Sequence, residues 1–425
     1  LRNKLNAPMR VAAQLSLDGE HRARRGGTPH DAALPSTPGV HPRAQPHPAP
    51  LRPKAAERST THKSERYGSI VPPPLLPLAC EVGAAPGYWG GARSLDWALH
   101  PTEQCPVALH AFVRVEPSAC GAKATGKSGL PTNLPTCVVQ DRAQLEALRN
   151  GSILMLGDST SAQLLMHACD AFASKALSFV ANASYFETLP NATKYRHRLR
   201  SMDNHACRLL GRRNGLGLPI GSFSHYGATG PPYWAYAYPL APWLGSTSVE
   251  QVERDAPSFS QRFVEGAPPD VVVVGSGFWD IAAWWLHEGN TSRSWEAGPS
   301  YIPRYVRGVD GLLTATRRTF PHSKIVWRTM HPGFKHSITP SVVAMLNEAV
   351  RAKSKDWQVP LFDVARMVDQ LPKSTHPVPL PKERGSPYGT VDGRHLHEWL
   401  NIGLLNVLLN LLSQTLRHRP SPTLA

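Results

Sequence analysis

The sequence predicts an α/β protein with a mostly parallel central sheet that is covered by helices on both faces. Short runs of apolar or β-branched residues alternate with longer amphipathic stretches in the later part of the 425-residue chain. The predicted strands are residues 152–156, 270–274, 324–327 and 359–362. The predicted helices are residues 160–173, 303–319, 341–352 and 398–416. Strands separated by helices in this way are typical of βαβ units, whose parallel sheets are buried on both faces.

The first 75 residues differ in composition from the rest and predict a disordered basic tail. They hold 12 Lys and Arg residues against 5 Asp and Glu, and 12 of the 41 prolines. Such a segment cannot bury enough apolar surface to offset the entropy lost on ordering it. Its role is open between a spacer, a stalk and a nonspecific anion-binding segment. Residues 76–150, rich in Cys, Pro and Gly, are expected to form an irregular segment packed on a domain spanning residues 151–425.

The net charge of +15 does not indicate a nucleic-acid-binding protein, because a large part of it lies in this tail. The rest of the charge is spread along the chain without a basic helix or an aromatic RNA-binding signature. No run of 18 apolar residues is present, so we expect no membrane contact unless an anchor precedes this sequence, which begins with Leu rather than Met. The sequence also has no metal cluster or dinucleotide-binding loop, so no bound cofactor is expected.

The cysteines indicate disulfide bonds formed in an oxidising compartment. There is an even number of them and none forms a CxxC pair, which argues against a structural zinc site. The six residues are Cys80, Cys105, Cys120, Cys137, Cys169 and Cys207. Four glycosylation sequons, at Asn150, Asn182, Asn191 and Asn290, point the same way. We therefore expect a location in the secretory pathway, in the Golgi lumen or outside the cell. The disulfide pairing is open, and an intracellular protein with six reduced thiols is the alternative.

The first motif that carries chemistry is Gly157-Asp158-Ser159, which links the strand at 152–156 to the helix at 160–173. A Ser on a tight strand-to-helix turn exposes its hydroxyl above the edge of the sheet. Its backbone N–H lies at a helix N-terminus, where positive partial charge stabilises an oxyanion. The same residues also suit an ordinary helix N-cap, so the motif needs a second element to indicate a function.

The second motif, Asp392-Gly-Arg-His395, lies just before the last predicted helix. A nucleophilic Ser needs a base, and the base needs an acceptor that fixes its tautomer. On a turn, Asp392 can accept from one imidazole nitrogen of His395 while the other faces Ser159. His397 is the competing candidate for the base, and a plain surface turn at Asp-Gly is the structural alternative.

Together these motifs resemble the SGNH/GDSL hydrolases. More closely, they are similar to the PC-esterase branch, which includes the plant trichome-birefringence-like polysaccharide O-acetyltransferases and the animal neurexophilin-and-PC-esterase-domain proteins. The similarity covers about residues 78–415. Its motifs, in order, are the Cys-rich segment with Gly87-Tyr-Trp89, the GDST run at 157–160, DVVVVGSGFWD at 270–280, Trp327 to Pro332, and the Asp392–His395 pair. Ala162 departs from the pattern, because the branch has Arg there.

The resemblance implies a three-layer α/β/α SGNH fold with Ser159 as nucleophile, His395 as general base and Asp392 as the residue that orients the base. It implies two oxyanion donors. One is the backbone N–H of Ser159, and the other comes from the loop after the next strand, where Gly227 is the candidate.

Four further residues are expected to support this site. Asp158 and Gly157 shape the nucleophile turn, and Gly277 matches a Gly of the family motif. Trp279 stands where ordinary SGNH enzymes have an Asn donor, so it either donates from its indole or walls the site.

Aromatic residues and one arginine are the candidates for substrate binding. Arg328 either binds an anionic or hydroxyl-rich group or pairs with a carboxylate as a structural residue. The aromatic candidates suit stacking on sugar rings, although a buried core position is the more common role for a Trp. They are Trp279, Trp284, Trp285, Trp295, Tyr233 and Trp234.

The resulting hypothesis is a serine-dependent acyl-ester enzyme, an O-acetyltransferase or an O-acetylesterase. It would act on glycan or polysaccharide acyl groups through an acyl-Ser159 intermediate, with an acyl donor as the second partner. The triad serves both reactions, so the sequence does not choose between them. The alternative is a catalytically inert glycan-binding or adhesion protein on the same fold. A third reading makes the basic tail the working part, with a nucleic acid or another anionic polymer as its partner.

Overall fold

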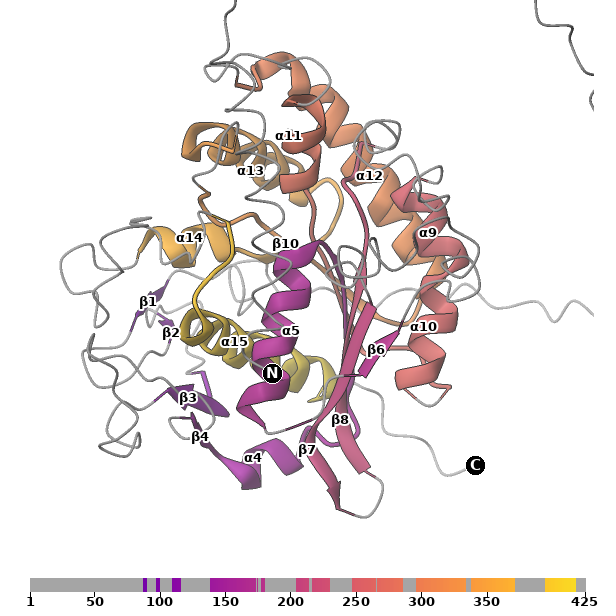
Figure 1. Cartoon of the computed structure of the whole chain (residues 1–425), viewed down its shortest axis with the longest axis vertical. Coiled ribbons are helices and arrows are strands. Elements are labelled where there is room, and N and C mark those ends of the chain that lie inside the picture. Colours follow the sequence, from indigo (N-terminus) through magenta and orange to yellow (C-terminus); the bar gives the residue numbers. More distant parts are fainter. Residues whose placement is uncertain are drawn as a thin grey trace, which may run out of the picture. The chain divides into compact units, whose positions relative to one another are not determined.

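A computed structural model describes residues 87–89, 97–99, 109–115, 138–172, 174, 177–179, 204–213, 216–229, 247–264, 266–285, 296–333, 338–370 and 394–417. Within this part, the largest sheet has seven strands in the order β11-β10-β9-β5-β8-β7-β6 (Figure 1). Their bounds are β5 (Ile153–Gly157), β6 (Leu177–Phe179), β7 (Asn204–Arg213), β8 (Leu216–Ser224), β9 (Val271–Val274), β10 (Lys324–Arg328) and β11 (Leu361–Phe362). The five strands from β11 to β8 are parallel, β7 pairs antiparallel with β8, and β6 pairs antiparallel with β7.

Helices cover both faces of this sheet, so the predicted α/β class with a mostly parallel sheet is confirmed (Figure 1). The side chains of Ile153 and Met155 pack with α5 (Ser159–Ala171), α14 (Val364–Asp369) and α15 (Glu398–Arg417). The alternate residues Leu154 and Leu156 point to the other face, as the two-residue period of a strand requires. The helices there are α9 (Ser248–Arg254), α10 (Ala256–Phe263), α11 (Phe278–Trp284), α12 (Ile302–Thr319) and α13 (Pro340–Ser354).

Two small antiparallel pairs precede this domain. They are β1 (Gly87–Trp89) with β2 (Trp97–Leu99), and β3 (Val113–Val115) with β4 (Val138–Gln140). The short helix α4 (Arg142–Glu146) follows and leads into β5. The tail of residues 1–75 lies outside the described residues.

All four predicted strands and all four predicted helices are present, but the β7–β8 hairpin is an addition that the sequence pattern did not predict. Strand β8 contains Pro219, which lacks an N–H and normally disfavours a central strand. The proline is tolerated because the pairing of β8 with β5 begins only at Ile220. Pro219 therefore lies where β8 has one neighbour, β7, at Arg208.

The apolar helix α15 is a core helix. Among the described residues it is the one helix long and apolar enough to cross a membrane, but 83% of its apolar window is buried inside the protein. Two of its buried asparagines hold the segment before β3. Asn410 accepts from the backbone N–H of His110 at 2.9 Å, and Asn406 accepts from that of Val113 at 3.2 Å. These pairs satisfy amides that burial would otherwise leave unpaired.

A disulfide bond joins Cys169 on α5 to Cys207 on β7, so at least one of the expected disulfides is present. Both residues are buried. The bond fastens the helix that carries Ser159 to the antiparallel half of the sheet. The other four cysteines lie outside the described residues.

Replacing Cys169 and Cys207 together with Ala is expected to lower the free energy of unfolding. The bond closes a loop with a sequence separation of 38, and the entropy of such a loop corresponds to about 3–4 kcal/mol. Urea unfolding of the variant and the parent protein measures the difference. Peptide mapping without reductant should recover the Cys169–Cys207 cross-link from the parent, and free thiols at these two positions would contradict the pairing.

Candidate active site

The Gly157-Asp158-Ser159 motif forms the predicted strand–turn–helix. Strand β5 ends at Gly157, Asp158 is the N-cap of α5, and Ser159 is the first helical residue. Asp158 accepts hydrogen bonds from the backbone N–H of Thr160 at 2.9 Å and from its hydroxyl at 2.6 Å. A side chain at Gly157 would overlap Ser161, so the close approach of the helix to the strand end requires glycine.

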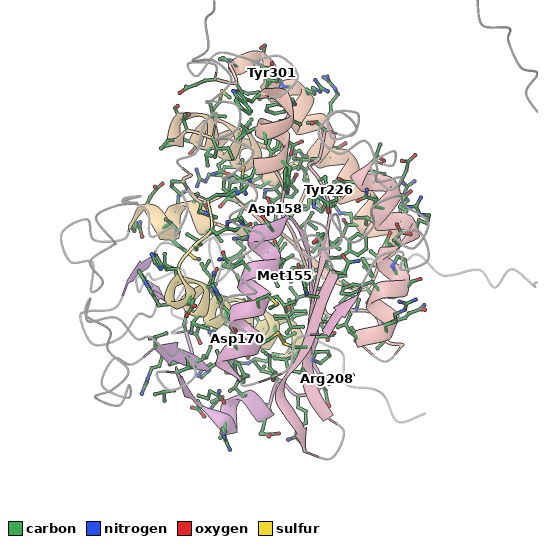
Figure 2. The ribbon with its side chains drawn as sticks, viewed as in Figure 1. Met155, Asp158, Asp170, Arg208, Tyr226 and Tyr301 are labelled. Carbon is green, nitrogen blue, oxygen red and sulfur yellow. A yellow bond between two sulfur atoms is a disulfide. The ribbon has the colours of Figure 1, made fainter. Side chains whose placement is uncertain are left out.

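Ser159 is the partly exposed residue of this turn, whereas Gly157, Asp158 and Thr160 are buried. Figure 2 shows Asp158 at one end of α5 and Asp170 at the other, with Tyr226 near the end of the sheet at which Asp158 lies. The turn lies at the carboxyl ends of the parallel strands, where ligands bind in open α/β sheets.

The structure brings Ser159 and His395 together across 236 positions of sequence. The hydroxyl Oγ of Ser159 lies 2.9 Å from Nε2 of His395. His395 is buried and precedes α15. The hydrogen bond of the Ser159 hydroxyl is therefore to His395 and not to the competing candidate His397. Asp392, the predicted orienting residue, lies outside the described residues.

Arg328 is buried beneath the turn that carries Ser159, so of the two predicted roles, binding a substrate group and serving as a structural residue, its placement favours the second. It ends β10, is 5% exposed, and donates from Nη1 to the hydroxyls of Thr160 at 2.8 Å and Ser161 at 3.2 Å. Burial lowers the pKa of the guanidinium, and the nearby Asp158 carboxylate opposes this shift. Thr160 thus bridges a buried carboxylate and a buried cation, because its hydroxyl donates to Asp158 and accepts from Arg328.

The loop after β8, which contains Gly227, is folded around the carboxylate of Asp280 on α11. Asp280 accepts from the backbone N–H of Ala228 at 3.0 Å and of Thr229 at 2.8 Å. Its other donors are the hydroxyls of Thr229 at 2.7 Å and Ser276 at 2.8 Å. Gly227 has φ of +89°, and a Cβ there would lie 2.9 Å from an Asp280 oxygen, so both its conformation and its surroundings require glycine.

His225 connects this loop to the nucleophile strand. Its backbone N–H donates to the carbonyl of Gly157 at 2.8 Å. Its side chain is fully buried, and burial lowers the pKa of the imidazole. The nearby carboxylates of Asp158 and Asp280 act in the opposite direction and raise it. Gly277, the other predicted glycine, is the N-cap of α11. The glycines at 157, 227 and 277 therefore lie at the ends of the neighbouring strands β5, β8 and β9.

Trp279 is half-buried, and its ring contacts two residues that sequence reasoning did not select. Its ring meets the ring of Tyr226 edge to face, with centroids 5.8 Å apart. The guanidinium of Arg394 lies 5.6 Å from the centroid of Trp279. Arg394 precedes His395 in the chain, so this aromatic and cationic group includes the residue next to His395.

Trp284 is a core residue, and its predicted role in substrate binding is wrong. It is completely buried and packs against Tyr301, with ring centroids 4.6 Å apart, and against Tyr305 at 6.4 Å. Trp285 is half-buried at the end of α11. Tyr233, Trp234 and Trp295 lie outside the described residues.

Two histidines near the site, the partly buried His167 and the buried His331, were also missed by sequence reasoning. His167 on α5 accepts at Nδ1 from the side-chain amide of Asn401 at 2.9 Å. Its pKa is lowered to about 4, mainly by burial and to a smaller extent by the nearby His397 and His395. The second is His331, which follows β10. No group of three or more His, Cys, Asp or Glu residues in the described part of the chain is arranged to hold a metal ion.

No protein-family model and no curated protein sequence matches the chain. Similar solved structures include a GDSL-like lipase from Parabacteroides merdae, with 15% identity, a TM-score of 0.33, and coverage of 62% of this chain and 97% of that one. An aryl esterase from M. smegmatis has 15% identity, a TM-score of 0.31, and coverage of 62% and 99%. A variant of an acetyl-xylooligosaccharide esterase from Geobacillus has 13% identity, a TM-score of 0.31, and coverage of 62% and 96%. These similarities are too low to assign a family.

Proposed function

We propose that the chain is a serine-dependent acyl-ester enzyme in which Ser159 is the nucleophile and His395 the general base. The 2.9 Å contact between Oγ and Nε2 carries this proposal. It places the base within reach of the proton that it must remove, on a partly exposed hydroxyl at the N-terminus of a helix. The order of motifs along the chain, which resembles that of the PC-esterase branch, supports the same assignment.

In the proposed reaction, Nε2 of His395 takes the Ser159 proton as Oγ attacks the ester carbonyl. The tetrahedral intermediate then collapses, the bond to the leaving alcohol breaks, and His395 returns the proton to that alcohol. Water or a sugar hydroxyl next attacks the acyl-Ser159 ester, and the same two proton transfers release the acid or the new ester and restore Ser159. Asp392 is proposed to accept from the other imidazole nitrogen.

The backbone N–H of Ser159 and that of Gly227 are proposed to stabilise the negative oxygen of the intermediate. The first lies at the N-terminus of α5, where the helix dipole favours negative charge. The second belongs to the loop that Asp280 fixes through two backbone amides. A loop held in this way needs little reorganisation as charge develops, which is the source of electrostatic catalysis.

The proposed substrate is a glycan or polysaccharide that carries O-acetyl groups or receives them from an acyl donor. The half-buried Trp279 and Tyr226 offer aromatic faces, and Arg394, the residue before His395, contacts the Trp279 ring. Such faces suit the apolar side of a sugar ring. A location in the Golgi lumen or outside the cell is proposed on two grounds: the Cys169–Cys207 bond, and the sequon at Asn150, which is exposed.

Labelling with a fluorophosphonate tests this function. We expect the parent protein to gain one adduct by intact mass, on the peptide that contains Ser159, and to be acetylated there by p-nitrophenyl acetate. Ser258→Ala, which removes an exposed hydroxyl on α10, is the control and should label normally. Glycan binding by a protein that takes no label would contradict the enzyme and favour an inert binding module.

A further inference from the structure

The four residues 328–331, which run from the end of β10, are themselves held firmly by neighbouring elements. The hydroxyl of Thr329 donates to the buried carboxylate of Asp363 at 2.9 Å. The backbone of Met330 is paired in both directions with the side chain of Asn347, which accepts from its N–H at 3.0 Å and donates to its carbonyl at 2.7 Å. These contacts anchor the segment to α13 and to the start of α14.

The first and last residues of this anchored segment reach the two halves of the catalytic pair. Arg328 donates to the hydroxyls of Thr160 and Ser161, the two residues that follow Ser159. At the other end, Nε2 of His331 forms a hydrogen bond with the backbone carbonyl of Arg394, the residue before His395. One rigid segment therefore contacts both the turn that carries the nucleophile and the turn that carries the base.

The tautomer of His331 follows from its partner. A carbonyl oxygen only accepts, so Nε2 must carry the proton and donate it to Arg394. Burial and the nearby Arg328 lower the pKa of the ring to about 3, so His331 is neutral at the pH of any ordinary assay. Phe278 contacts the ring edge to face, with centroids 5.1 Å apart, which fixes the plane of the imidazole.

We propose that His331 is a positioning residue that sets the distance between His395 and Ser159. The carbonyl of Arg394 belongs to the peptide unit that joins it to His395. Holding this oxygen fixes the direction in which the chain enters His395 and hence the place of its ring. This inference rests on the proposed function, because only a reaction that uses the Ser159–His395 pair depends on that distance.

Replacing His331 with Leu tests the inference. Loss of the donor frees the Arg394 carbonyl, and a displacement of a catalytic group by about 1 Å costs about 10²-fold in rate. We expect kcat for p-nitrophenyl acetate to fall by about 10²-fold and KM to change by less than about twofold, because the small substrate does not contact His331. The rate of fluorophosphonate labelling should fall in parallel.

Two amide variants separate the hydrogen bond from packing. The side-chain nitrogen of Gln occupies the position of Nε2, whereas that of Asn occupies the position of Nδ1. His331→Gln should therefore retain most of the kcat, and His331→Asn should lose it as His331→Leu does. This comparison also decides the matter if His331→Leu does not fold. Equal kcat in the Gln and Asn variants would overturn the proposal.

Gln140→Leu is the matched control, because it also removes a side-chain donor to a backbone carbonyl. Gln140 on β4 donates to Ala171 at 3.0 Å, at the opposite end of α5 from Ser159. We expect this variant to lose stability with kcat unchanged. If the parent protein is active and a folded His331→Leu matches its kcat, this inference alone is wrong. If the parent neither labels nor turns over substrate, the proposed function is wrong and the inference is wrong with it.

Discussion

Replacing either Ser159 or His395 with Ala is expected to lower kcat for p-nitrophenyl acetate by about 10⁴-fold or more. The double variant should be no slower than the slower single variant. The two side chains are 2.9 Å apart, and as a nucleophile and its base they would act as one unit, so removing either would leave the other without a role. Steady-state kinetics of the two single variants and the double variant measure this lack of additivity.

The stability of these variants separates a chemical loss from a structural one. Ser159 is partly exposed, and the N-cap bonds of α5 come from Asp158 and Thr160, which both variants retain. We expect Ser159→Ala to unfold within a few degrees of the parent protein. Multiplicative losses in the double variant, or full activity in either single variant, would show that the two residues do not act as a nucleophile and its base.

The core of the fold could be predicted from the sequence because its strands are short, apolar and separated by periodic helices. The run Val271–Val274 is buried on both faces, and such a run has few alternatives to a central parallel strand. The β7–β8 hairpin could not be predicted in the same way. Strand β7 carries several arginines, and β8 contains Pro219 and glycines, and these residues mask the strand pattern.

The Ser159–His395 pair could be predicted because each residue lies in a short local motif. The residues that support the pair carry no such signal. Asp280 and His331 bind backbone atoms of distant loops, and a backbone N–H or carbonyl has no sequence signature. Trp284 was misjudged for a related reason. A Trp beside a motif suits either a binding surface or the core, and only its packing against Tyr301 and Tyr305 distinguishes the two.

Removing the carboxylate of Asp280 is expected to have the largest effect on stability among the site variants. Its oxygens accept from two backbone amides and two hydroxyls, and these four hydrogen bonds are buried or partly buried. Asp280→Ala leaves the amides of Ala228 and Thr229 without acceptors. Each stranded buried donor costs about 1–3 kcal/mol, so we expect a loss of about 3 kcal/mol or more in the free energy of unfolding, measured with urea.

Asp280→Asn should lie between the parent and the Ala variant, for a geometric reason. One oxygen of Asp280 faces the amide of Thr229 and the other faces the amide of Ala228. An Asn side chain offers one oxygen, so in either orientation it satisfies one amide and turns its NH₂ toward the other. The hydroxyl that donates to the replaced oxygen can rotate to accept from this NH₂, so one stranded amide, worth about 1–3 kcal/mol, is the net cost.

The same variants report on catalysis, because the loop they loosen contains Gly227. We expect kcat to fall in the order of the parent, Asp280→Asn and Asp280→Ala, at temperatures where all three are folded. Asp270→Ala is the matched control for Asp280→Ala. Asp270 is also buried and accepts from Ser152 at 2.8 and 3.0 Å, but it lies at the amino ends of the strands. This control should lose stability and keep its kcat. An unchanged kcat in a folded Asp280→Ala would instead mean that the loop after β8 supplies no donor to the reacting oxygen. The backbone N–H of Ser159 would then be the one proposed oxyanion donor that remains.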